Sequence, residues 1–508
     1  MNFFYLNIFF TLFFSWAFNS STPQLSIWKP GHIVTDTIVG PGVEATTVAT
    51  GLDVPWEIIW GPDNKIWITE QKGLVSRIDP VTGGKQVILT IPDVWHLRTA
   101  GLLGMALHPD MKNNPYVFLN YTFLKDKKPH SKLVRYTWKN EVLVNPKVLL
   151  VIPGNNGHNG SRLTIWKGKL YWATGDAVTD GNAQNVNSLN GKILRLNFDG
   201  SIPKDNPRKG SAVWAWGFRN MQGLVFSKKG YLYSSEHGDA TEDEVNLLTP
   251  NRNYGWPTVQ GFAENEEETA FKKAKQTVDP VKAWTPTIAP AGLDYYYSDV
   301  IPGWKNSLLL VTLKGRSLRV LKLSEDGRSI INEDVLFENE YGRLRDVCIS
   351  PAGDVYISTS NHDWNPMGKP IASDDRIIKI SKSDKPFSNP VLATNQVLSN
   401  TATGATLYVQ YCASCHKEDG KGVAGIFPPL EGSERVNSAE RSLVAKVLKG
   451  STGPAVINGV KYDITMPSFA FLKDEQVADI LTYVRQLGVN ETSPVSVNMV
   501  KEVRREVK

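Results

Sequence analysis

The sequence predicts an all-β domain, a six-bladed β-propeller, followed by a small all-α domain. Two observations support this order. Between about residues 47 and 381, short strands of alternating apolar and aromatic residues follow turns rich in Gly, Pro, Asp and Asn. Beyond about residue 400, apolar residues recur at helical spacing instead.

The turn and strand pattern repeats roughly every 45 to 60 residues, which is the spacing of propeller blades. Residues 61–69, 166–172, 227–233 and 350–357 show it most clearly. One blade cannot bury both of its faces, so neighbouring blades stack around an axis. A chain of roughly 330 residues at this spacing has room for about six blades. A pair of packed β-sheets is the alternative fold.

Composition excludes some classes of function. The net charge is 56 − 51 = +5 over 508 residues, and no basic run of five or more occurs, so we expect no nucleic-acid binding. The chain has three cysteines, of which two share one motif. The third, Cys348, lies in an alternating strand-like run and is expected to be an inert buried thiol. No disulfide framework is therefore expected.

Residues 1 to about 20 are nearly all apolar and predict an export signal at residues 1–22. No Lys or Arg precedes the apolar run, so an uncleaved membrane anchor is the alternative. No second apolar run approaches about 18 residues, the length that spans a membrane. We expect a soluble mature protein in the periplasm, with membrane contact only if the signal is uncleaved.

Changes of composition divide the rest of the chain. The predicted propeller covers residues 45–382, and residues 383–400 are rich in Ser, Pro and Asn and predict a linker. Residues 401–490 predict the helical domain, and residues 491–508 form a polar tail that we expect to be loose. Within the propeller, residues 264–275 are charged and poor in turn residues, which predicts a solvated insertion or a short exposed helix.

The helical domain contains Cys412-Ala413-Ser414-Cys415-His416, the C-x-x-C-H attachment sequence of a c-type haem. Cys412 and Cys415 would bond to the porphyrin and His416 to the iron. The carbonyl of Pro428 is expected to accept from the other nitrogen of His416. Met466 is the expected second axial ligand, the alternative being core filling. Residues 401–490 are thus predicted to be a cytochrome c domain with one covalent haem c, an attachment generally made outside the cytoplasmic membrane.

Two polar residues of the propeller indicate acid–base chemistry. His158 lies in a loop rich in Gly and Asn, and Asp176 follows a strand 18 residues later. A histidine oriented by a carboxylate can act as a general base near neutral pH. A turn histidine bound to backbone is the alternative.

Other polar segments indicate an anionic ligand and a metal. Adjacent Arg219 and Asn220 lie between glycines, where they can meet an anion. Arg343 and Arg345 are spaced i, i+2, which places both side chains on one face of a strand. Together with Lys314 they suit a ligand with several carboxylates. A solvated surface is the alternative. The turn at Gly238 and Asp239 lies among carboxylates and is a plausible Ca²⁺ site.

Over residues 47–381 the sequence resembles the soluble glucose and aldose sugar dehydrogenases that depend on pyrroloquinoline quinone (PQQ). The stretches that carry the resemblance are residues 101–104, 108–110, 191–197, 199–207 and 253–257. The resemblance implies a six-bladed propeller, in agreement with the repeat spacing.

The resemblance also implies roles for individual residues. His158 would remove the proton from the sugar C1 hydroxyl, with Asp176 orienting it, while the C1 hydride passes to PQQ. Arg219 would stabilise negative charge on the quinone oxygen. The carbonyls of Gly238 and Asp239 would bind Ca²⁺. The residues that would hold PQQ are Arg219, Asn220, Thr287, Lys314, Arg343 and Arg345.

The fused cytochrome would then accept electrons one at a time and pass them to a soluble cytochrome or a membrane oxidase. Some positions depart from the family pattern. Thr99 stands where a glutamine touches sugar, Gly157 where an aspartate precedes the base, and Met221 and Asp239 each replace a proline. The same chemistry on a sorbosone-like aldehyde or a non-sugar alcohol is therefore an alternative. So is a propeller that binds carbohydrate or a partner, with the cytochrome as a relay.

Overall fold

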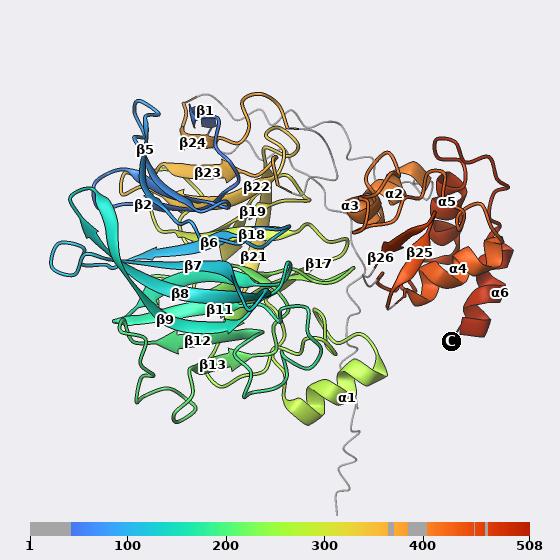
Figure 1. The fold of residues 1–508 in the computed structure, drawn as a ribbon, viewed down its shortest axis with the longest axis horizontal. Helices are drawn as coiled ribbons and strands as arrows, with labels where there is room; N and C mark the ends of the chain where they lie inside the picture. The colour runs from blue at the N-terminus through green and yellow to red at the C-terminus, as the bar shows by residue number, and fades with distance from the viewer. Residues whose placement is uncertain (1–41, 364–369, 385–403, 452, 463–465, 508) are drawn as a thin grey trace, which may run out of the picture. The chain divides into compact units, whose positions relative to one another are not determined.

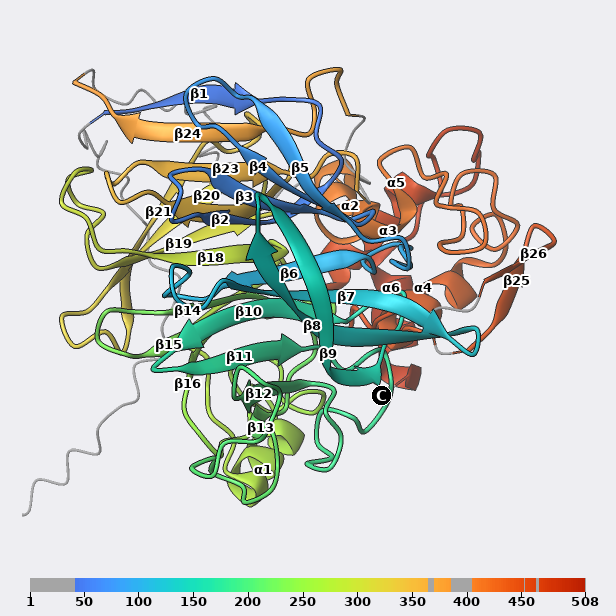
Figure 2. The ribbon, with the colours of Figure 1, turned by 60° about the vertical axis from the view of Figure 1, so that its left-hand side comes forward.

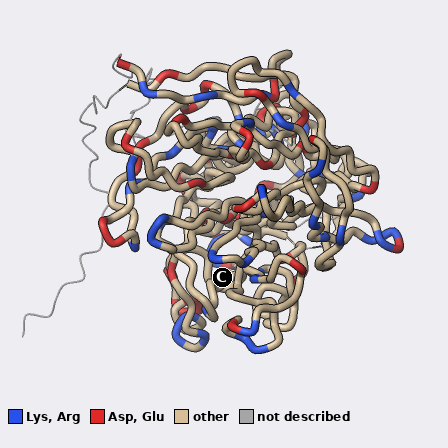
Figure 3. The backbone as a smooth tube through the Cα atoms, turned by 90° about the vertical axis from the view of Figure 1, so that its left-hand side faces the viewer, with Lys and Arg blue, Asp and Glu red and all other residues tan. Residues whose placement is uncertain are grey.

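The computed structural model describes residues 42–363, 370–384, 404–451, 453–462 and 466–507. The expected signal or anchor at residues 1–22 lies outside the described residues, as does most of the expected linker at 383–400. Among the helices of the described ranges, none is both long and apolar enough to cross a membrane. Figure 3 shows acidic and basic residues interspersed along the chain, in keeping with the small net charge.

In the described chain the strands of the first domain form six four-stranded antiparallel sheets, each meandering outward from its first strand (Figures 1 and 2). The first two sheets contain β2 (Pro55–Trp60), β3 (Ile66–Glu70), β4 (Leu74–Ile78) and β5 (Lys85–Thr90), then β6 (Leu102–Leu107), β7 (Tyr116–Lys125), β8 (Lys128–Lys139) and β9 (Val142–Pro153). The third contains β10 (Gly160–Trp166), β11 (Lys169–Thr174), β12 (Lys192–Leu196) and β13 (Val213–Trp216). The fourth and fifth contain β14 (Met221–Phe226), β15 (Leu232–Glu236), β16 (Asp243–Leu248) and β17 (Lys282–Trp284), then β18 (Pro290–Tyr296), β19 (Ser307–Thr312), β20 (Leu318–Leu323) and β21 (Ile330–Leu336).

The last sheet combines the two ends of the domain. It contains β22 (Leu344–Ile349), β23 (Val355–Thr359), β24 (Ile377–Lys382) and the N-terminal β1 (Val43–Ala49). Strand β1 pairs antiparallel with β24, with Val43 opposite Lys382. Beyond this pair, the backbone N–H of Ser383 donates to the carbonyl of Gly42 at 2.7 Å. The outermost strand of this blade is therefore the first strand of the domain, which closes the ring.

The cores of the domain lie between neighbouring blades. The innermost strands β2, β6, β10, β14, β18 and β22 each contact the next around the ring, and β22 contacts β2. Between the second and third blades, Phe118 packs with Trp172 and Leu194, and all three side chains are inaccessible to solvent. The six-bladed propeller predicted from the repeat spacing is thus confirmed, and the paired-sheet alternative is wrong. Cys348 is buried in one of these cores, and burial raises the pKa of its thiol well above the usual range.

Strand direction determines where polar loops meet. Because every blade runs antiparallel from the inside outward, the loop before each innermost strand and the loop after the second strand open on the same face. These loops carry most of the polar residues singled out in the sequence. The fold therefore collects residues from distant parts of the chain at one mouth of the propeller.

Residues 264–275 form the expected exposed helix, α1 (Glu266–Lys275), which buries no side chain. The side chain of Asn265 accepts from the backbone N–H of Glu268 at 2.9 Å and caps the first turn. Acidic residues in the first turn and lysines in the last complement the helix dipole.

The second domain is small and mainly helical. Its elements are α2 (Gly404–Tyr411), α3 (Ala413–His416), α4 (Glu440–Lys449), β25 (Ala455–Ile457), β26 (Val460–Tyr462), α5 (Asp474–Val484) and α6 (Val497–Val507). Leu407, Val444 and Leu481 meet in its core. The loose polar tail expected at residues 491–508 is wrong for most of its length, because α6 packs on α4 and α5 and buries Val500 and Val503.

We predict that Val500→Asp destabilises the second domain by about 2–5 kcal/mol, because it places a carboxyl group in an apolar core. Thermal unfolding of the haem-loaded protein, followed at the Soret band, measures this. Asn498→Asp adds the same residue at an exposed position of α6 and should leave the transition unchanged. Equal transitions for the two variants would mean that α6 does not belong to the core.

Candidate functional site

A histidine and a carboxylate lie together at the mouth of the propeller. The Nδ1 of His158, in the loop before β10, donates to Oδ1 of Asp176, which follows β11, at 2.9 Å. The two loops are also joined by the backbone, because Ala177 N donates to the carbonyl of His158 at 3.0 Å. A Cβ on Gly175 would lie 2.0 Å from that carbonyl, so glycine permits the close approach.

The surroundings hold this histidine neutral. Burial lowers the pKa of His158, the positive charge of Arg219 lowers it further, and Asp176 only partly opposes them. For Asp176, burial raises the pKa, but the hydrogen bond from His158, the backbone N–H of Val178 and the positive charge of Arg219 outweigh it, so the pKa is lowered on balance. A neutral imidazole with Nδ1 bound to a carboxylate leaves Nε2 as a free base.

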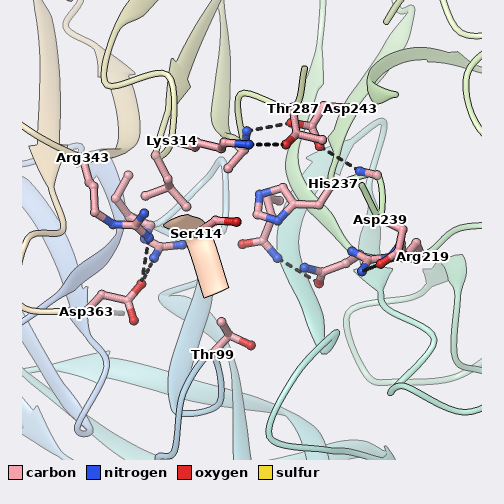
Figure 4. A pocket seen from close by; sticks show the side chains of 16 residues that line it. Thr99, Arg219, His237, Asp239, Asp243, Thr287, Lys314, Arg343, Asp363 and Ser414 are labelled. Atoms are coloured by element: carbon pink, nitrogen blue, oxygen red, sulfur yellow. Dashed lines mark hydrogen bonds and ion pairs between the residues drawn. The ribbon is translucent and has the colours of Figure 1, made fainter. Parts of the chain in front are cut away.

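Arg219 connects this pair to an adjoining polar pocket. Its guanidinium pairs with Oδ1 of Asp239 at 2.9 Å and lies over the ring of Trp256 at 5.2 Å (Figure 4 shows the Arg219–Asp239 pair). Trp256 in turn donates from Nε1 to Oδ2 of Asp176 at 2.8 Å. The Nε of Arg219 is buried and has no hydrogen-bond partner within the described residues.

The pocket brings together the cations that the sequence singled out (Figure 4). Lys314, after β19, donates from Nζ to Oγ1 of Thr287 at 2.8 Å. Burial lowers the pKa of Lys314, while the charge of Asp243 opposes the shift. On the other wall are Arg343 and Arg345, at the start of β22.

Both arginines contact one carboxylate, Asp363, which follows β23. The Arg343 guanidinium lies 3.7 Å from Oδ2 of Asp363, and Arg345 makes a short ion pair with the same oxygen. Arg345 also lies over the ring of Trp56 at 3.9 Å and is 1% exposed. Burial lowers its pKa to about 10, which leaves it charged at neutral pH. The i, i+2 spacing thus places both cations toward one pocket, as expected.

Carboxylates fix the backbone of the neighbouring loops. Glu236 accepts from the backbone N–H groups of Arg219 and Asn220. Asp243 accepts from Gly238 N at 2.8 Å and from two further backbone groups near Thr287. Burial raises the pKa of Asp243 to about 6, against the opposing effect of these hydrogen bonds.

The turn at Gly238 and Asp239 could hold a metal through backbone carbonyls. A Cβ on Gly238 would lie 1.9 Å from the carbonyl of Thr241, so no larger residue fits this turn. Within the described residues no group of three or more His, Cys, Asp or Glu side chains could hold a metal ion. A metal here would depend on carbonyl oxygens and a ligand, which suits Ca²⁺.

Thr99 and Gly157, two positions that depart from the pattern of the resembling family, offer few polar groups. Thr99 lines the pocket, but its hydroxyl donates to the carbonyl of Asn156 at 3.3 Å. Gly157 follows Asn156 and has no side chain to offer. These two positions therefore give a ligand few polar contacts.

The second domain presents the expected haem ligands. His416, at the end of α3, is buried, and its Nδ1 donates to the carbonyl of Pro428 at 2.8 Å. Its Nε2 remains for the iron. Met466 lines the same cavity as His416, Cys412 and Cys415, and the rest of the wall in this domain is largely apolar.

Sequence reasoning missed several residues of the propeller site. Asp363 follows a strand without a motif, although two buried arginines require a counter-ion. Trp256 lies within residues 253–257, which carry the resemblance, and His237 directly precedes the turn at Gly238. His237 faces the pocket with an Nε2 that has no partner among the described residues, and burial lowers its pKa to about 3.

Comparison with known proteins agrees with this fold. Residues 52–366 match the glucose/sorbosone dehydrogenase family, and residues 401–488 match the cytochrome c family. Quinoprotein glucose dehydrogenase B of Acinetobacter calcoaceticus is 30% identical over 402 residues, covering 61% of this chain and 84% of that protein. Cytochrome c-552 of Thermus thermophilus is 40% identical over 87 residues, covering 16% of this chain and 66% of that protein.

Among solved structures, the PQQ-bound aldose sugar dehydrogenase of Streptomyces coelicolor superposes with a TM-score of 0.59 at 32% identity, covering 67% of this chain and 99% of that one. The fold and the site thus define a dehydrogenase-type propeller fused to a cytochrome c. The chain belongs to the glucose/sorbosone dehydrogenase family.

We predict that Asp363→Asn lowers the stability of the ligand-free protein by about 3–5 kcal/mol, because it leaves two buried arginines without their counter-ion. Denaturant titration measures this. Asp299→Asn removes a carboxylate whose side chain is 77% exposed and paired with Lys305, and should cost at most about 1 kcal/mol. A multiply anionic ligand should stabilise Asp363→Asn more than wild type; equal stabilisation would contradict the assigned role.

Proposed function

We propose that the chain is an exported quinohaemoprotein that oxidises the C1 hydroxyl of aldose sugars, with PQQ and Ca²⁺ in the propeller and a covalent haem c as the electron outlet. The observation that carries the proposal is the hydrogen-bonded pair of His158 and Asp176 beside a pocket with buried cations. The family membership and the PQQ-bound relative support the same cofactor. Export is supported by the apolar residues 1–22 and by the haem attachment sequence.

The residues of the pocket fit a small ligand with three carboxylates and an orthoquinone. Lys314, Arg343 and Arg345 supply fixed positive charge for the carboxylates. The Nε of Arg219 has no hydrogen-bond partner among the residues that the structure describes, and Thr287 and Asn220 offer neutral polar groups. When bound, PQQ supplies the acceptor for the hydride that leaves the sugar C1.

The protein's own groups handle the proton and the developing charge. Nε2 of His158 takes the proton of the C1 hydroxyl, while Asp176 stabilises the imidazolium that results. Arg219 stabilises negative charge that develops on the acceptor. The carbonyls of Gly238 and Asp239 would hold Ca²⁺, which would add its positive charge to that of Arg219.

His416 and Met466 would bind the haem iron, and the haem would supply the ability to accept one electron at a time. A methionine ligand together with a histidine would raise the iron potential, which suits electron transfer. An external soluble cytochrome or membrane oxidase then accepts the electrons. The few polar contacts near Thr99 and Gly157 support a broad preference among aldoses over selection of one sugar.

The test is reconstitution of the haem-loaded protein with Ca²⁺ and PQQ, followed by a panel of aldoses, a sorbosone-like aldehyde and simple alcohols, read as reduction of the protein's own haem. We predict that His158→Ala lowers the rate of substrate-driven reduction by roughly 10²–10⁴-fold, because the general base is lost. His130→Ala is the matched control, since His130 lies on β8 and does not line the described pocket. No haem reduction with any aldose would refute the proposal.

The pH dependence follows from the lowered pKa of His158. The base is active when neutral, so kcat/KM should rise with pH through this pKa and reach half its plateau below the usual value of 6.5. Asp176 raises the pKa of His158, so Asp176→Asn should move the acid limb to still lower pH while it lowers the plateau. Stopped-flow reduction across pH measures both. An acid limb above 6.5, or one that moves upward in Asp176→Asn, would contradict the assignment of the base.

A further inference from the structure

Trp256 lies between the two halves of the candidate catalytic machinery. Its indole nitrogen contacts the carboxylate of the base pair, and its ring lies against the guanidinium that faces the cofactor pocket. It belongs to the loop that follows β16.

The contact with Asp176 uses the oxygen that His158 leaves free. Oδ1 of Asp176 accepts from His158 Nδ1 at 2.9 Å and from Val178 N at 2.8 Å, and Oδ2 accepts from Trp256 Nε1 at 2.8 Å. Both oxygens are therefore engaged, so the carboxylate cannot rotate without losing a donor. Its plane fixes the direction in which it meets the imidazole.

The contact with Arg219 uses the face of the ring. The guanidinium carbon lies 5.2 Å from the ring centroid, within the range of a cation–π interaction. Asp239 holds the same guanidinium by an ion pair at 2.9 Å. The carbonyl of Arg219 also accepts from the backbone N–H of Asp176 at 2.8 Å, so the three residues form one connected unit.

Trp256 is itself held by its backbone. Its N–H donates to the carbonyl of Gly217 at 3.1 Å, and its carbonyl accepts from the side chain of Gln184 at 2.6 Å. Gln184 is fixed in turn by reciprocal hydrogen bonds with Asn253 at 2.8 and 3.0 Å. The indole is thus part of a rigid scaffold.

We propose that Trp256 is a positioning residue that fixes the Asp176 carboxylate, and through it the Nδ1–H tautomer of His158, while its ring supports Arg219. It does not need to touch substrate. The role of the base rests on the proposed function, whereas the effect on the tautomer of His158 does not.

Trp256→Phe tests the proposal because it keeps an aromatic ring beside Arg219 and removes the donor to Asp176. In the ligand-free protein, ¹⁵N-labelled histidine NMR should show His158 protonated at Nδ1 in wild type and a mixture of the two tautomers in Trp256→Phe. After reconstitution, kcat for substrate-driven reduction should fall roughly 10–100-fold with little change in KM. Trp166→Phe is the matched control, since Trp166 stacks on Phe226 with centroids 4.9 Å apart.

A double variant shows whether Trp256 acts through Asp176 or affects the reaction rate independently of it. Residues that act as a unit are not additive, so Asp176→Asn with Trp256→Phe should be no slower than Asp176→Asn alone. If Trp256→Phe does not fold, benzothienylalanine at position 256, in which sulfur replaces the indole N–H, removes the donor with the shape preserved.

The proposal is overturned if the variant keeps a single Nδ1–H tautomer, or if its kcat stays within about twofold of the Trp166→Phe value. Additive losses in the double variant would also overturn it. If wild-type protein oxidises no sugar, the proposed function fails, yet the tautomer measurement still decides whether Trp256 positions His158.

Discussion

The pairing of β1 with β24 is the contact on which the site depends. It completes the ring, and a closed ring places the start of every innermost strand on the same face. Residues from the loop before β10 to the loop after β23 are thereby brought to one mouth, although they are far apart in the sequence. No single blade contains both the histidine–carboxylate pair and the cations, so the site is a property of the assembled ring.

Buried charge is the second constraint. Arg219, Lys314, Arg343 and Arg345 lose water on folding, and each loss must be balanced by an oxygen of the protein or of a ligand. Asp363 pairs with Arg343 and Arg345, and Asp239 pairs with Arg219. Thr287 accepts a hydrogen bond from Lys314. The pocket is therefore organised before any ligand arrives. An anionic ligand meets positive groups that are already oriented, which limits the reorganisation that binding requires.

The repeat, the haem sequence and the residues flanked by glycines were predictable because each follows a spacing rule. Arg343 and Arg345 were predictable in the same way, because side chains at i and i+2 of a strand point to the same face. Asp363 and Trp256 were not predictable, because they reach the site from loops whose course depends on tertiary contacts. Helix α6 was missed for another reason. Its composition is polar, yet Val497, Val500 and Val503 recur at helical spacing. The periodicity of these apolar residues predicts the helix, whereas the overall composition does not.

The junction of Gly42 and Ser383 also affects how such a protein can evolve. The chain enters the propeller at β1 and leaves it at β24, and these two strands are paired in the same blade. A module added after β24 changes no blade and lengthens no loop at the mouth that holds the site. An electron-accepting domain can thus be gained, lost or exchanged by recombination at this seam, while the chemistry of the propeller stays as it was.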